Sequence, residues 1–588
     1  MIKLLPALRY ILHLSILTFL LILMAFFFQP QNTGVDAKEG NTLLGNYLAG
    51  RFATAQRDNH TAAEYYRQAL KKDASNKLLL EQSFLLEINA GNWRHVSSLA
   101  KQLVKFEPNH YTARLFLGTQ ALKRRQYRAA KEHFSRSGQG AVPELTTELA
   151  LAWTNFAQNN TKKALANITV NQDKNWLNLY RRYHRALIAD LSKNSKLASV
   201  DYKYISKKSP NDFRTTLAHV RHALKQGEFM QAKKVLDKFS TFVQGTIHPN
   251  IEELYGYTKN KQNTHPIVQN AKEGLAEVFY GLGDALSSDG GVDYGAIYLK
   301  LALYLKPDME SVHVVLANIY ERTKKYDLAI KTYKNITENS PLWPRAQLRK
   351  ALNYNYMDKV DEATALLKNL IKARPDDIQP VETLGNILRV RKRYEEALVY
   401  YDKAVKFVQD NPTKKNWVQF YHRGVSYERL NQWKKAETDL NTALKLDPNQ
   451  ALVLNYLGYS WVDQNYNLDK AINLIRRAVQ LKPNDGYIVD SLGWAYYRLG
   501  DYKSAVKYLE KAVYLKPDDS VINDHLGDAY WYVGRRTEAK YQWSQALSLK
   551  PEKKEIATIE AKLREGLPDV KQTDQARLKG KKKPVLKE

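Results

Sequence analysis

The sequence predicts an all-α protein, a solenoid of stacked helix pairs, and two observations lead to this prediction. Small residues and prolines recur with a period of 34 residues in the last third of the chain. The segments before the prolines place apolar side chains at the i, i+3/i+4 and i+7/i+8 spacing of an amphipathic helix. Because one such helix pair cannot bury its apolar face alone, whereas stacked pairs can, we expect a quasi-one-dimensional superhelix.

The repeat is defined by a Gly, an Ala 12 residues later and a Pro 24 residues after the Gly, with one extra residue in the repeat of Gly458. The Gly and the Ala are expected to face each other where two helix backbones approach closely, and the Pro to end the second helix. The residues after each Pro, among them Asn449, Asp485 and Asp519, are good N-caps for the next helix. These repeat positions are Gly424, Ala436 and Pro448, Gly458, Ala471 and Pro483, Gly493, Ala505 and Pro517, and Gly527, Ala539 and Pro551.

This pattern, with an aromatic residue three positions after each Gly (Tyr427, Trp461, Tyr496 and Tyr530), resembles the tetratricopeptide repeat, a helix-turn-helix unit. The resemblance implies a right-handed superhelical solenoid in which the first helix of each repeat lines an inner groove. It also implies a bacterial scaffold protein that is membrane-anchored or exported.

The repeat spacing divides the chain into segments. A regular array is expected over 271–551, and looser spacing, as in Gly50–Ala62 and Gly118–Ala130, predicts a degenerate array over 41–240. A distinct domain over 41–240 is the alternative, and it would also be helical. The polar residues 241–270 contain helix breakers and are expected to form a joint. A capping helix is expected within 552–570, followed by a disordered tail over 571–588 that has seven basic and two acidic residues.

Residues 1–37 are expected to be a cytoplasmic stub followed by an anchor or signal. Residues 10–28 carry no formal charge and follow Lys3 and Arg9. A helix of this length nearly spans a hydrocarbon core of roughly 30 Å, so we favour an inner-membrane anchor with the repeats in the periplasm. The alternative is a cleaved signal ending near Ala37 and release to the periplasm. The absence of Cys excludes a lipoprotein anchor and disulfides.

The chain is strongly basic, with 90 Lys and Arg against 61 Asp and Glu. Such a surface suits nucleic acid, anionic lipid or acidic partners. We expect no nucleic acid, because the chain looks exported, its charge is spread through the repeats, and no zinc-finger or RNA-binding signature occurs. Most basic residues are expected to cover solvated outer faces. The alternative is that the tail contacts an anionic envelope polymer or lipid surface.

No catalytic motif occurs in the sequence. There is no His-Glu-x-x-His pair, no phosphate-binding Gly-x4-Gly-Lys-Ser/Thr loop and no Gly-x-Ser-x-Gly elbow. We therefore predict no enzyme activity, no cofactor and no metal.

The resemblance places groove-lining residues three before, one after and four to five after each Gly. Asp490 and Asp524, one repeat apart, are candidates to hold a Lys or Arg of an extended partner. Aromatic residues and Arg are frequent anchors of binding surfaces. Each side chain could instead pack on the next repeat or face water, but the set as a whole favours binding. The candidate groove residues are Tyr421, Asn455, Tyr459, Asp490, Trp494, Tyr497, Arg498, Asp524, Asp528, Trp531 and Tyr532.

The predicted function is that of a non-catalytic scaffold of the bacterial cell envelope, whose groove binds other envelope proteins to support assembly of envelope or secretion machinery. The family's carboxylate clamp for chaperone C-termini is doubtful here, because Asp490 and Asp524 would repel a terminal carboxylate. The alternative is an accessory protein that binds or exports polysaccharide or peptidoglycan, with Trp494, Tyr497 and Trp531 stacking on sugar rings.

Overall fold

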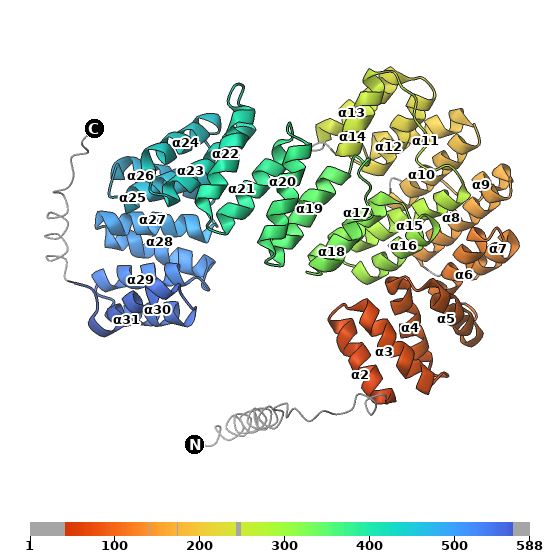
Figure 1. Ribbon diagram of the computed structural model, residues 1–588, viewed down its shortest axis with the longest axis horizontal. Coiled ribbons are helices and arrows are strands. Elements are labelled where there is room, and N and C mark those ends of the chain that lie inside the picture. The colour runs from red at the N-terminus through yellow and green to blue at the C-terminus, as the bar shows by residue number, and fades with distance from the viewer. Residues whose placement is uncertain (1–41, 139, 173–174, 243–247, 569–588) are drawn as a thin grey trace. The chain divides into compact units, whose positions relative to one another are not determined.

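The computed structural model describes residues 42–568, except 139, 173–174 and 243–247. All regular secondary structure in these residues is helical, as the sequence predicts. The chain divides into two compact units between Leu342 and Trp343, and not at the joint expected over 241–270, which holds helix α14. Figure 1 shows the helices in chain order.

The first unit consists of successive helix pairs. Its helices are α2 (Leu43–Ala55), α3 (Asn59–Lys72), α4 (Lys77–Ala90), α5 (Trp93–Phe106), α6 (Tyr111–Lys123), α7 (Tyr127–Ser135), α8 (Ala141–Ala157), α9 (Thr161–Ala166), α10 (Trp176–Leu191), α11 (Ser195–Lys208), α12 (Phe213–Lys225), α13 (Phe229–Phe242), α14 (Pro249–Lys259), α15 (Ala271–Ser288), α16 (Val292–Leu305), α17 (Glu310–Arg322) and α18 (Tyr326–Tyr333).

The second unit continues the pairs and ends on a single helix. Its helices are α19 (Trp343–Tyr356), α20 (Val360–Ala373), α21 (Ile378–Val390), α22 (Tyr394–Val408), the short η1 (Lys414–Asn416), α23 (Trp417–Arg429), α24 (Trp433–Leu446), α25 (Ala451–Asp463), α26 (Leu468–Leu481), α27 (Gly486–Leu499), α28 (Tyr502–Leu515), α29 (Ser520–Tyr532), α30 (Arg536–Ser548) and α31 (Lys553–Glu565).

The repeated Gly and Ala lie where the two helices of a pair meet. A Cβ atom added to Gly493 would lie 2.6 Å from Leu509 Cγ, and one added to Gly458 would lie 2.9 Å from the carbonyl oxygen of Ala471. Ala471 and Ala505 are fully buried. The expected close approach of the two backbones is therefore present, and it leaves no room for a larger side chain.

The helix ends mostly follow the predicted signals. Helix α28 ends two residues before Pro517. The Asp519 side chain then accepts hydrogen bonds from the backbone N–H groups of Val521 and Ile522. The cap predicted at Asn449 is wrong: α25 has Gln450 as its N-cap, without a side-chain hydrogen bond.

In the first unit, the pair α15–α16 packs against the first helices of earlier pairs, α15 on α8 and α10, and α16 on α4 and α6. The buried Glu277 of α15 accepts hydrogen bonds from Tyr183 Oη at 2.8 Å and Arg214 Nε at 2.9 Å. Since first helices line the inner face of such an array, the inner face of the first unit is filled by the chain's own helix pair.

Between residues 42 and 568, outside the gaps given above, no helix combines the length and apolar character needed to cross a membrane. The predicted anchor over 10–28, the cleavage site near Ala37 and the basic tail over 571–588 lie outside the described residues.

Candidate partner-binding groove

The candidate groove residues lie on four successive first helices of the second unit. Tyr421 is on α23, Asn455 and Tyr459 are on α25, Asp490 to Arg498 are on α27, and Asp524 to Tyr532 are on α29. Direct contacts between α25 and α27, and between α27 and α29, bring these side chains together across the repeats.

Aromatic rings contact one another from repeat to repeat on these helices. The ring centroids of Tyr421 and Tyr456 are 5.8 Å apart. The Trp494 ring stacks on Tyr497, with 4.6 Å between centroids, and on His525, with 4.0 Å. Tyr456 and His525 were missed from the sequence, although both stand two residues before a repeat Gly, and aligning the repeats on the Gly reveals this shared position.

The Asp490 carboxylate is buried and bound within the chain. His525 Nδ1 donates to Asp490 Oδ1 at 2.9 Å. Burial lowers the pKa of His525, but the nearby carboxylates, Asp490 foremost, outweigh it and hold that pKa above its usual value. The Asp490 carboxylate, which the sequence predicts to hold a cation of the partner, is therefore bound by His525 of the same chain.

The carboxylates of Asp524 and Asp528 both bind Lys562 of α31. Lys562 Nζ lies 2.7 Å from Asp524 Oδ2 and 2.8 Å from Asp528 Oδ1. Trp543 Nε1 also donates to Asp528 Oδ1, at 2.9 Å. Burial raises the pKa of Asp528 to about 6, against the opposing charge of Lys562. The sequence predicts that Asp490 and Asp524 hold a basic side chain of a partner, whereas in the structure Asp524 shares Lys562 of the same chain with Asp528.

The end of the groove is covered in the same way. Trp531 Nε1 donates to the carbonyl oxygen of Leu567 at 3.0 Å, and Tyr532 Oη donates to that of Pro568 at 3.0 Å. Gly566 lies against the Trp531 ring, where an added Cβ would come within 2.0 Å. Helix α31 and residues 566–568 therefore occupy the part of the groove formed by α29.

The remaining candidates lie on α23, α25 and α27. Tyr459 is half-buried, and burial together with the Asp490 charge raises its pKa to about 12. Arg498 Nη2 lies 3.4 Å from the carbonyl oxygen of Asp463. The buried Oδ1 atom of Asn455 accepts no hydrogen bond from any described residue.

Within the described residues, no group of His, Asp and Glu side chains is arranged to hold a metal ion. The groove presents aromatic rings, the amide of Asn455 and carboxylates that are bound by side chains of the same chain.

Comparison with known proteins identifies the repeat. Models of the tetratricopeptide repeat match residues 311–341, 348–412, 419–450 and 490–519. The TPR repeat-containing protein PA4667 of Pseudomonas aeruginosa is 30% identical over 198 residues, which are 34% of this chain and 32% of that protein. The BBSome complex member BBS4 of Bos taurus is 26% identical over 191 residues, 32% of this chain and 36% of that protein.

The match thus spans about a third of the length of each relative. Among solved structures, the APC/C hetero-tetramer Cut9-Hcn1 is similar at 15% identity and a TM-score of 0.36, over 89% of this chain and 96% of that chain. The matched segments include the repeat residues Gly424 and Gly493 with their Ala and Pro partners. The chain therefore carries tetratricopeptide repeats, as its sequence predicts.

Proposed function

We propose that the second unit is a non-catalytic scaffold that holds an extended segment of a partner protein along α23, α25 and α27. The observation that carries this proposal is the row of half-buried aromatic side chains on these helices, which includes Tyr421, Tyr459 and Tyr497. Aromatic side chains bury a large area at a small cost in conformational entropy, which suits them to anchoring a peptide.

The electrostatics of the groove refine the kind of partner. Asp490 is bound by His525, and Asp524 and Asp528 are bound by Lys562. The groove therefore offers no free carboxylate pair for a basic side chain. We expect recognition through apolar and aromatic side chains of the partner, with hydrogen bonds to its backbone.

We place this scaffold in the bacterial cell envelope, anchored through residues 10–28 with the repeats in the periplasm. Two observations support this: the uncharged apolar run after Lys3 and Arg9, and the similarity to a protein of Haemophilus influenzae named a lipoprotein NlpI homolog. That relative is 35% identical over 86 residues, 14% of this chain and 27% of that protein. Protease added to spheroplasts should digest the repeats, and protection of the repeats would contradict this placement.

The polymer-binding alternative receives less support from the geometry. The Trp494 ring already stacks on Tyr497 and His525, and Trp531 is held by Leu567 and Gly566. Sugar stacking would require these contacts to open. No second function is therefore proposed for this groove.

Site-specific photocrosslinking tests the scaffold. A photoreactive phenylalanine derivative replaces Tyr459 or Tyr497 on the inner face, and Tyr514, which is 85% exposed on the second helix α28, serves as the control. A protein crosslinked at Tyr459 and Tyr497 but not at Tyr514 is the expected result. Equal crosslinking at the three positions, or crosslinking at Tyr514 alone, would refute the inner face as the binding surface.

A further inference from the structure

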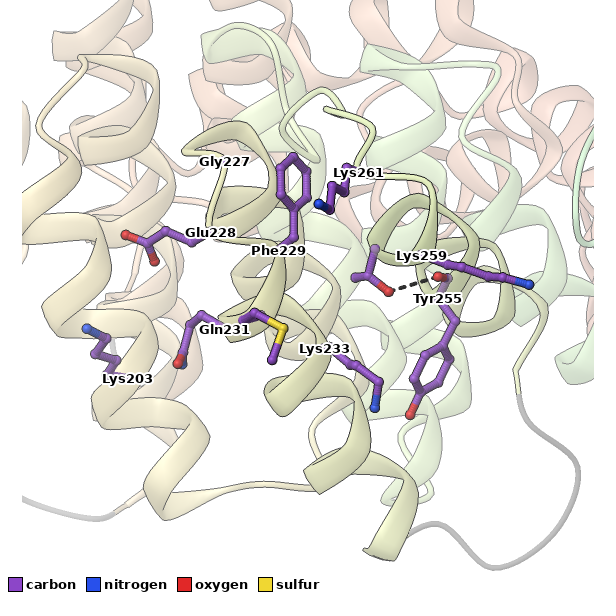
Figure 2. Close-up of a pocket in the computed structure, with 11 residues that line it drawn as sticks. Lys203, Gly227, Glu228, Phe229, Gln231, Lys233, Tyr255, Lys259 and Lys261 are labelled. Atoms are coloured by element: carbon purple, nitrogen blue, oxygen red, sulfur yellow. Dashed lines mark hydrogen bonds between the residues drawn. The ribbon is translucent and has the colours of Figure 1, made fainter.

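A groove lined by lysines lies on the outer side of the first unit, over α11, α13 and α14. It consists of two adjoining hollows of about 1040 Å³ and about 170 Å³ that share Lys203 and Gln231. Figure 2 shows the larger hollow. We call the two hollows together the lysine groove. Its lysines are Lys203, Lys207, Lys233, Lys234, Lys238, Lys259 and Lys261.

The charge of the lysine groove is almost entirely of one sign. Seven lysines face a single carboxylate among the lining residues, that of Glu228. Lys233 pairs with Asp237 at 2.7 Å, and Lys238 donates to the carbonyl oxygen of Ser206. The other five lysines are exposed and form no ion pair with any described residue. The sequence predicts basic charge that is spread through the repeats, and the stacking of the helices brings seven of these residues together here.

A histidine also lines the lysine groove. His219 lines the smaller hollow, and its Nδ1 lies 2.8 Å from Ser206 Oγ. Burial, followed by the charges of His222 and Lys203, lowers the pKa of His219 to about 4.

The larger hollow also has an apolar part. Phe229, Met230 and Tyr255 line it together with the lysines, and Met230 is 82% exposed although it carries no charge. Lysine side chains can lay their methylene stems along such a surface while the ammonium groups stay in water. The groove therefore combines an apolar contact with a surrounding ring of positive charge.

The occupant of the lysine groove has to differ from that of the inner face. The inner face of the first unit is filled by α15 and α16, whereas α11 and α13 are second helices of consecutive pairs and face outward. The chain's own tail over 571–588 has seven basic and two acidic residues, so it would be repelled. A hollow of this volume receives protruding side chains, whereas a flat lipid surface would reach only its rim.

We propose that the lysine groove binds an acidic peptide segment of a partner protein, with an apolar side chain of that segment seated against Phe229, Met230 and Tyr255. The carboxylates of the segment lie among the seven lysines, and they provide fast association and sensitivity to salt. This site lies on a different unit and face from the groove of the proposed function and does not depend on it.

The test measures binding of a fluorescent peptide, Glu-Asp-Glu-Leu-Asp-Glu-Glu, to the full chain by fluorescence polarisation. Reversing the charge of three groove lysines, Lys203→Glu, Lys234→Glu and Lys259→Glu, should weaken binding about tenfold or more. The matched control reverses three exposed lysines on second helices of the other unit, Lys434→Glu, Lys503→Glu and Lys511→Glu, and should change binding less than about twofold. Equal losses would overturn the proposal, because net charge alone would then explain binding.

A second comparison tests the apolar contact. Replacing the Leu of the peptide with Ser should weaken binding to the parent, and the same replacement should have little effect on the Met230→Ser variant. Because Met230 is largely exposed, this variant keeps the fold. Equal binding of the two peptides by the parent would contradict a seated side chain. The parent could instead bind vesicles of anionic lipid and no peptide, with vesicle binding lost in the groove variant. That result would overturn the proposal and identify the occupant as a membrane surface.

Discussion

Removing the charge of Lys562 should open the C-terminal end of the second unit. In the Lys562→Met variant, Asp524 and Asp528 remain as two close carboxylates without their shared cation. The Lys562 side chain is 11% exposed, and those of Asp524 and Asp528 are 19% and 7% exposed. The site is therefore closer to a buried pair than to a surface pair.

Breaking a buried ion pair by removing one partner costs about 3–5 kcal/mol. Because Asp524 keeps partial contact with water, we expect a loss at the low end of this range, about 3 kcal/mol in the free energy of local unfolding. This loss corresponds to roughly a hundredfold in the equilibrium constant for local unfolding. In a solenoid each repeat contacts its neighbours, so the loss should be confined to α29, α30 and α31.

Hydrogen exchange at neutral pH measures this effect. Amides of α29 to α31 should lose roughly a hundredfold in protection, whereas those of α23 and α24 should keep theirs. Lys554→Met is the control, because Lys554 is 76% exposed and should change the unfolding free energy by less than about 0.5 kcal/mol. Adding Asp524→Asn and Asp528→Asn to Lys562→Met should restore much of the protection. Unchanged protection in Lys562→Met would refute the assignment of this lysine as the cap of the groove.

Three further predictions concern packing, pH and the anchor. Gly493→Ala should destabilise the second unit by about 1–3 kcal/mol in urea unfolding, because its Cβ would meet Leu509, whereas Gly256→Ala, with no atom within 4 Å, should be tolerated. The pKa values of His525 and Asp528 are raised in the folded protein. The contribution of each group to the free energy of unfolding is therefore complete below its unfolded-state pKa and is lost as the pH rises through its folded-state pKa, which is about 6 for Asp528. The urea midpoint for unfolding of α29 should therefore fall from pH 5 to pH 8, and it should fall less in the Asp528→Asn variant. A midpoint that is the same at each pH would contradict this prediction. Deleting residues 10–28 should release the protein from the membrane fraction, and unchanged sedimentation with membranes would argue against an anchor there.

The repeat register could be read from the sequence because it rests on local rules. Gly493, Ala505 and Pro517 each act within one helix pair, so their spacing was enough to predict the close packing and the helix end. The packing of α15 and α16 into the first unit could not be read in this way. It depends on matches between distant residues, such as Arg214 with Glu277, 63 residues apart, that leave no periodic signal.

In the candidate groove, too, the positions within a repeat could be predicted from the sequence, whereas contacts with other repeats could not. The aromatic and acidic positions followed from the repeat, and the structure places them on neighbouring first helices. The partners of the carboxylates did not follow, because they belong to the next repeat or to the cap. Lys562 stands one 34-residue period after Asp528, so extending the register past Pro551 would have found it.

The filled inner face gives the first unit a different kind of cooperativity from the second. Tyr111 and Tyr298 are hydrogen-bonded across 187 residues of chain, and Lys123 donates to the carbonyl oxygen of Tyr304 across 181. Forming these contacts closes long loops, an entropic cost that the stacking of neighbours alone does not carry. The intervening pairs are thus enclosed in a ring of contacts. A deletion or duplication of one pair there would displace α15 and α16 from their positions. In the second unit the same change would break contacts between neighbouring repeats and the ion pair between the exposed side chains of Lys392 and Glu552.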